Sequence, residues 1–152
     1  MPLIHSSADP DFFKMLTESY RRLVGSALTG AHLGPAWLYE DAPFAVLAHE
    51  TDADPRFIYA NRTAQRCFEY SWDELISMPS RLSAEAPNRA ERQKLLDAVS
   101  RDGYVTGYRG VRIAKSGRRF WIEDGVVWQL IDAAGVYRGQ AAMFAAWKNV
   151  QP

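Results

Sequence analysis

Apolar residues recur at helical spacing in the first part of the chain. They fill one side of a helix between Asp11 and about Leu28, and together they form a wide stripe: Phe12, Phe13, Met15, Leu16, Tyr20, Leu23, Val24, Ala27 and Leu28. The segment GAHLGP then interrupts the pattern with two glycines and a proline. We therefore expect residues 1–33 to be an N-terminal helical extension with a linker.

Short apolar runs separated by turn residues follow the linker. A compact run before HETDADP and another after it predict a hairpin, and the turn signals KSGRR and DAAG separate three longer runs. The expected strands are 44–48, 57–60, 104–114, 119–131 and 137–147. Residues 85–101 carry apolar positions among alternating charges, which predicts a surface helix that stops at Asp102-Gly103.

The segment from Phe57 to Pro79, FIYANRTAQRCFEYSWDELISMP, joins the hairpin to this helix. Asn61 is placed to cap a short helix, in which Ala64 and Phe68 share a face. Ser71 and Glu74 have capping-box spacing, so a second short helix is expected there. Residues 34–150 are thus predicted to form one α+β domain.

Composition and charge narrow the class of protein. Hydrophobic residues make up 47% of the 152 residues, and 18 basic residues balance 18 acidic ones. A chain without excess positive charge is not expected to bind nucleic acid. No apolar run approaches the roughly 20 residues of a membrane helix, and the N-terminus lacks a signal-peptide pattern, so we expect a cytoplasmic protein without a membrane partner.

The order of strand, Asn, Ala, Phe, Ser, Glu, Leu and Ile in residues 57–79 resembles that of PAS domains, which are small sensory modules. Three segments, YEDAPFAVLAHETDADPRFIYANR, PSRLSAEAPNRAER and SGRRFWIEDGVVWQLID, further resemble the MEKHLA domain, a PAS-like family. That family occurs in plant homeodomain-leucine zipper transcription factors and as free-standing bacterial proteins. The chain is similar to the bacterial type. No homeodomain or zipper is present in this sequence, so the DNA-binding role of the plant proteins is not expected. The resemblance implies a five-stranded antiparallel sheet with helices on one face, plus the N-terminal helix.

The resemblance to flavin-binding light-oxygen-voltage domains does not extend to their key residues. Ser80 stands where those domains carry the reactive cysteine, although Arg81 matches an arginine that contacts the flavin phosphate. Gln140 directly follows Gly139, and a shift by one residue is expected to turn it to the other face of its strand. Flavin is therefore not expected, and the cofactor is left unknown.

Haem and metal sites are not expected either. None of the histidines, His5, His32 and His49, lies on the helix that carries the axial ligand in haem-binding PAS domains. A metal site at His49, Asp52 and Asp54 is an alternative, but these aspartates fit a turn better. Cys67 is expected to be a small buried hydrophobe rather than a nucleophile.

Strict alternation along residues 119–131 places Asp124 on the same face as Phe120, Ile122, Val126, Trp128 and Leu130. A carboxylate on an apolar face needs a partner or a ligand. The candidate partners are Arg81, Arg109 and Arg112. An internal ion pair and a polar contact in a ligand pocket both remain open.

Two functions follow from the resemblance and the pattern. The first is a sensory module that binds a small organic ligand noncovalently and signals through protein contact. Its expected ligand-binding residues are Phe68, Arg81, Tyr108, Arg112, Ile122, Asp124, Val126, Trp128 and Phe144. The alternative is a ligand-free dimerisation or docking module with a filled core. No nucleophile, acid-base pair or phosphate loop stands out, so an enzyme is not expected.

The apolar stripe of the N-terminal helix is wider than one sheet face should need. We therefore expect a homodimer, with a regulatory protein as a further possible partner, and the interface would use Phe12, Phe13, Leu16, Tyr20, Leu23, Val24 and Leu28. The competing interpretation is that this helix folds back over its own sheet.

Overall fold

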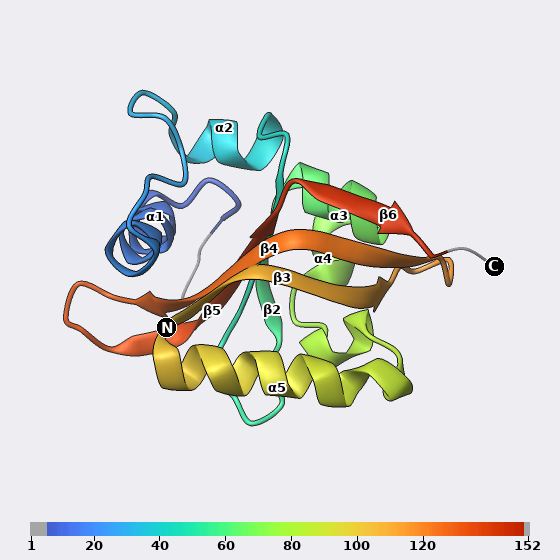
Figure 1. The fold of residues 1–152 in the computed structure, drawn as a ribbon. Helices are drawn as coiled ribbons and strands as arrows, with labels where there is room; N and C mark the ends of the chain where they lie inside the picture. The colour runs from blue at the N-terminus through green and yellow to red at the C-terminus, as the bar shows by residue number, and fades with distance from the viewer. Residues whose placement is uncertain (1–5, 151–152) are drawn as a thin grey trace.

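The computed structural model describes residues 6–150, which form one sheet with helices against both faces (Figure 1). The elements in chain order are α1 (Pro10–Val24), α2 (Pro35–Glu40), β1 (Ala45–His49), β2 (Phe57–Ala60), α3 (Arg62–Phe68), α4 (Trp72–Leu75), the 3₁₀ helix η1 (Ser80–Ser83), α5 (Ala86–Asp102), β3 (Tyr104–Ile113), β4 (Arg119–Ile131), β5 (Tyr137–Phe144) and β6 (Ala146–Asn149).

The sheet is antiparallel throughout, in the order β2-β1-β5-β4-β3, with β6 paired to β4. This arrangement confirms the predicted α+β fold and its sheet. The last expected strand, 137–147, is divided into two. β5 pairs with the C-terminal half of β4 and with β1, whereas β6 pairs with the N-terminal half of β4.

A bulge in the middle of β4 determines which side chains face which helices. Tyr108 pairs with Gly125 and Gly110 with Ile122, so β4 carries one more residue than β3 between these pairs. The extra residue lies at Asp124, whose φ of 50° is left-handed. A bulge of this kind shifts the alternation of side chains by one residue. The expectation that Asp124 lies on the apolar face is therefore wrong, and its side chain is exposed.

The two halves of β4 consequently bury their apolar side chains on opposite faces. Phe120 and Ile122, before the bulge, pack with α3 on the face that also holds α5, and the Phe68 and Phe120 ring centroids lie 5.1 Å apart. Trp128 and Leu130, after the bulge, pack against α1 instead. α3 and α5 thus lie on one face, and α1 covers the other, where Leu38 and Tyr39 of α2 join the same core.

Tight packing fills the face under α1. The Trp128 indole Nε1 donates a hydrogen bond to the Leu16 carbonyl at 3.2 Å, and the Tyr20 ring stands edge-on to it with centroids 4.8 Å apart. Asp9 caps the start of α1, and Gly25, with a left-handed φ of 91°, ends it before the predicted boundary at Leu28.

The position of α1 shows where its wide apolar stripe is buried. Four of the seven residues assigned to a dimer interface, Phe12, Leu16, Tyr20 and Leu28, are buried inside the chain. The other three, Phe13, Leu23 and Val24, are partly buried and pack against the same core. The helix folds back over its own sheet, as the competing interpretation held. The oligomeric state itself stays a prediction.

Side-chain caps fix the segment between the hairpin and α5. The Asn61 amide oxygen accepts from the backbone nitrogens of Val46 and Ala64, and its nitrogen donates to the carbonyls of Leu38 and Phe44. This one side chain ties α2, β1 and α3 together, and the predicted cap is confirmed. The capping box of Ser71 and Glu74 is confirmed as well. α2, which begins at Gly34-Pro35, was not predicted.

Candidate ligand cavity

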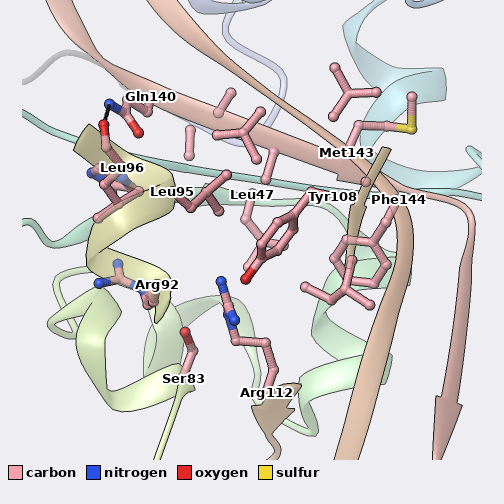
Figure 2. A pocket seen from close by; sticks show the side chains of 18 of the residues that line it. Leu47, Ser83, Arg92, Leu95, Leu96, Tyr108, Arg112, Gln140, Met143 and Phe144 are labelled. Atoms are coloured by element: carbon pink, nitrogen blue, oxygen red, sulfur yellow. Dashed lines mark hydrogen bonds between the residues drawn. The ribbon is translucent and has the colours of Figure 1, made fainter. Parts of the chain in front are cut away.

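A cavity of about 70 Å³ lies between the sheet and α5. Leu47 of β1, Tyr108 of β3, Phe144 of β5 and Leu95 of α5 form part of its wall (Figure 2). Small residues on the strands, among them Gly125 and Ala142, leave the space that larger side chains would fill. A volume of this size holds several waters, since one water needs about 10–15 Å³.

Three buried polar atoms on residues that line this cavity have no hydrogen-bond partner among residues 6–150. They are His49 Nε2, the Tyr108 hydroxyl and Gln140 Oε1. A buried polar atom without a partner costs about 1–3 kcal/mol, so native proteins rarely leave several of them together. All three atoms belong to residues that line this one cavity, which makes it the candidate site within the described residues.

The His49 ring presents a hydrogen-bond acceptor. Its Nδ1 lies 2.9 Å from the Glu50 carbonyl oxygen, and because a carbonyl only accepts, the proton sits on Nδ1. Burial lowers the pKa of His49 to about 4, an effect that the charge of Arg92 reinforces although the Glu50 contact opposes it. The ring is therefore neutral at pH 7, with the Nε2 lone pair unused.

Gln140 presents a second acceptor beside it. The residues are directly opposite in the β1–β5 ladder, where neighbouring Cβ atoms lie about 4.5–5.5 Å apart. The Gln140 amide nitrogen donates to the Leu96 carbonyl at 3.1 Å and to Ser100 Oγ at 3.2 Å, which fixes the orientation of the amide and leaves Oε1 unpaired. Gln140 lines the cavity, so the expectation that it turns to the other face is wrong.

Tyr108 folds back over its own strand into the cavity. A Cβ at Gly110 would lie 2.0 Å from the Tyr108 hydroxyl, so only glycine allows this position of the ring. The Arg112 guanidinium lies 5.4 Å from the Tyr108 ring centroid, and Figure 2 shows it beside the hydroxyl. A cation–π contact at this distance favours the arrangement but leaves the hydroxyl unpaired.

Two buried arginines line the same cavity. Arg92 on α5 donates to Ser80 Oγ, and Arg112 on β3 donates to the Val111 carbonyl at 3.0 Å. Each is 7% exposed. Burial, together with the charge of Arg112, lowers the pKa of Arg92 to about 10 even though Tyr108 and Asp54 act in the opposite direction. The Arg92 guanidinium therefore stays charged at pH 7.

Six of the nine residues predicted to bind a ligand line the cavity: Phe68, Tyr108, Arg112, Ile122, Val126 and Phe144. The other three do not. Arg81 forms a surface ion pair with Asp54 at 3.1 Å, Asp124 is exposed, and Trp128 lies on the face under α1. Arg109, once a candidate partner for Asp124, instead contacts Glu123 at 3.0 Å.

His49, Arg92 and Gln140 line the cavity but were not among the residues predicted to bind a ligand. Alternation along β1 and β5 places His49 opposite Gln140, which was the available signal. For Arg92 the signal was its position three and four residues before Leu95 and Leu96, which places it on the apolar face of α5 although it stands among alternating charges.

Other candidate chemistry lies outside this cavity. Within the described residues, no group of three or more His, Cys, Asp or Glu side chains is arranged to hold a metal ion. His5 lies outside those residues. Cys67 is buried, and burial raises its pKa to about 12, which confirms it as a small hydrophobe. Across residues 6–150, no helix has the length and hydropathy that crossing a membrane requires.

Solved structures with the same fold are PAS and light-oxygen-voltage domains. A PAS domain from Colwellia psychrerythraea aligns with a TM-score of 0.63 at 16% identity, over 76% of this chain and 92% of that one. An RNA-binding light-oxygen-voltage receptor aligns with a TM-score of 0.62 at 21% identity, over 78% of this chain and 35% of that one. A light-oxygen-voltage domain studied with a flavin analogue gives 0.57 at 15% identity, over 70% and 77%. These likenesses establish the fold.

No curated protein matches the sequence. The model of the MEKHLA domain family matches residues 10–149, a span that runs from α1 to the last residue of β6. This span agrees with the packing of α1 on the sheet as part of one core. The chain therefore belongs to the MEKHLA domain family.

Proposed function

We propose that this protein is a non-enzymatic sensory module that binds a small organic molecule in the cavity between the sheet and α5. The single observation that carries the proposal is that three residues lining one cavity, His49, Tyr108 and Gln140, each have a buried polar atom without a partner in residues 6–150. A few placed polar groups on an apolar wall are typical of small-molecule sites. The fold shared with PAS domains supports a sensory role.

The size of the cavity restricts the ligand. Cofactor and drug sites occupy about 300–1,000 Å³, several times the volume found here. The proposed ligand is thus a compact metabolite bound without a covalent link.

α5 is the element that would pass binding to the surface. Gln140 reaches its Leu96 and Ser100, and the Gln129 amide nitrogen donates to the carbonyls of Val99 and Ser100, each at 3.1 Å. A ligand at Gln140 Oε1 therefore acts on a side chain that already holds α5. We propose that a regulatory protein or a second copy reads this change, in the cytoplasm and without nucleic acid or membrane.

Native mass spectrometry of the full chain, purified without denaturation, tests the proposal. We expect a retained small molecule, which Ala142→Leu displaces because the added carbons occupy the cavity. Val136→Ala, a change at an exposed hairpin residue, is the matched control and keeps the ligand. A wild-type protein that retains nothing, together with a stable dimer in light scattering, would favour the docking module instead.

A further inference from the structure

The two buried arginines of the cavity have no acidic partner. None of the described cavity residues is an aspartate or glutamate, and no ion pair within residues 6–150 involves Arg92 or Arg112. The carboxylate whose charge acts on Arg92 is that of Asp54, which is partly exposed and pairs with Arg81. Buried charges in proteins are normally paired.

The two charges also act on each other. The charge of Arg112 helps to lower the pKa of Arg92, so the two guanidiniums lie close enough to repel each other. Figure 2 shows Arg92 and Arg112 at the same end of the cavity, near Ser83. Two like charges held together in an apolar setting destabilise the protein unless an anion joins them.

We propose that the ligand is a small carboxylic acid whose carboxylate binds Arg92 and Arg112. This inference rests on the proposed ligand-binding function and names the class of its ligand. A carboxylate matches the donor fork of a guanidinium, and it is the smallest organic anion that does so. The apolar wall around Leu47, Leu95 and Phe144 receives the carbon chain.

The ligand also carries a hydrogen-bond donor. His49 Nε2 and Gln140 Oε1 both accept, and neither has a protein donor in the described part of the chain. A hydroxyl or amino group satisfies them, whereas a second carboxylate would face two acceptors. Short hydroxy acids and amino acids have this pattern.

Four compounds of nearly equal size test the carboxylate and the hydroxyl group separately: propionate, lactate, propionamide and lactamide. Calorimetric titration of the full chain at matched ionic strength measures their affinities. We expect lactate to bind most tightly, propionate more weakly, and both amides at least about tenfold more weakly than their acids, as for loss of a hydrogen bond to a charged group.

Arg112→Gln should reduce lactate affinity about tenfold or more, while Arg109→Gln, at an exposed residue of the same strand, leaves it unchanged. The melting temperature of ligand-free Arg112→Gln is a second readout. It should equal or exceed that of wild type, because the variant removes an unpaired buried charge. A structural role of Arg112 predicts a lower value. Arg92→Gln gives the same pair of readouts if Arg112→Gln does not fold.

Two results would overturn the inference and are distinguishable. If the amides bind as well as the acids, or if native mass spectrometry identifies a retained neutral molecule, the cavity binds ligands. The assignment of a carboxylic acid as the ligand is then wrong. If no compound binds and no molecule is retained, the ligand-binding function fails as well.

Discussion

The two faces of the sheet use the same strands in different ways. Under α1, large side chains such as Trp128, Tyr20 and Leu16 fill the space, and the Trp128 indole finds a backbone acceptor. Under α5, the strands carry small residues, and the residues that line the cavity include two arginines and three with an unpaired polar atom. The Tyr59 hydroxyl is the one unpaired polar atom recorded on the α1 face within the described residues. One face is therefore tightly filled, and the other contains the cavity to which we assign the proposed ligand.

The bulge at Asp124 creates this division within β4. Before it, even-numbered residues face α3 and α5; after it, even-numbered residues face α1. Without the extra residue, Trp128 and Leu130 would fill the cavity side, because side chains alternate strictly along a regular strand. The largest side chain of the core is thus kept out of the cavity.

The largest expected effect concerns the filled face. Trp128→Ala should lower the free energy of unfolding by about 3–5 kcal/mol, because it removes a fully buried ring and leaves a void. Urea denaturation measures the loss. Trp121→Ala, on the same strand but half-buried, is the matched control and should cost less. Equal losses would mean that the α1 face is not the tightly packed one.

Neighbouring alanines of β5 compare the faces directly. Ala141 pairs with Trp128 and packs under α1, whereas Ala142 pairs with Val127 and packs near α5. Ala141→Leu should cost about 1–3 kcal/mol through overpacking. Ala142→Leu should leave the stability unchanged or raise it by up to about 1 kcal/mol by filling the cavity. Thermal denaturation of both variants tests the contrast, and the reverse order would contradict it.

The unpaired hydroxyl of Tyr108 gives a smaller effect. Tyr108→Phe should stabilise the ligand-free protein by about 1 kcal/mol, since it removes a buried polar atom that lacks a partner in residues 6–150. Equilibrium unfolding without added ligand measures the gain. A loss of stability would show that the hydroxyl already has a partner.

The smallest effect is expected at Asp124. Asp124→Asn should change the free energy of unfolding by less than about 0.5 kcal/mol, because the side chain is exposed and asparagine also tolerates the left-handed backbone. Lactate affinity should not change. A clear loss of affinity would return this residue to the binding site.

Local signals were sufficient for much of the fold. The capping residues at Asn61 and in the Ser71–Glu74 box predict the starts of their helices, and turn residues separate the strands. The bulge at Asp124 could not be predicted, because the apolar alternation continues across it in the sequence. Leu95 and Leu96 share the helix face of Arg92, but the burial of Arg92 still depends on the tertiary packing of α5 on the sheet. The site was therefore only partly predictable.

Nuclear magnetic resonance of the full chain during titration with lactate tests the central claim most directly, because one spectrum reports on both faces. The Nε–Hε signals of Arg92 and Arg112 report on the cavity, and the indole N–H signal of Trp128 reports on the face under α1. Our account predicts that both arginine signals shift together and saturate while the Trp128 signal stays in place. Saturable shifts of Trp128 with unmoved arginine signals, or no saturable shift at all, would contradict it.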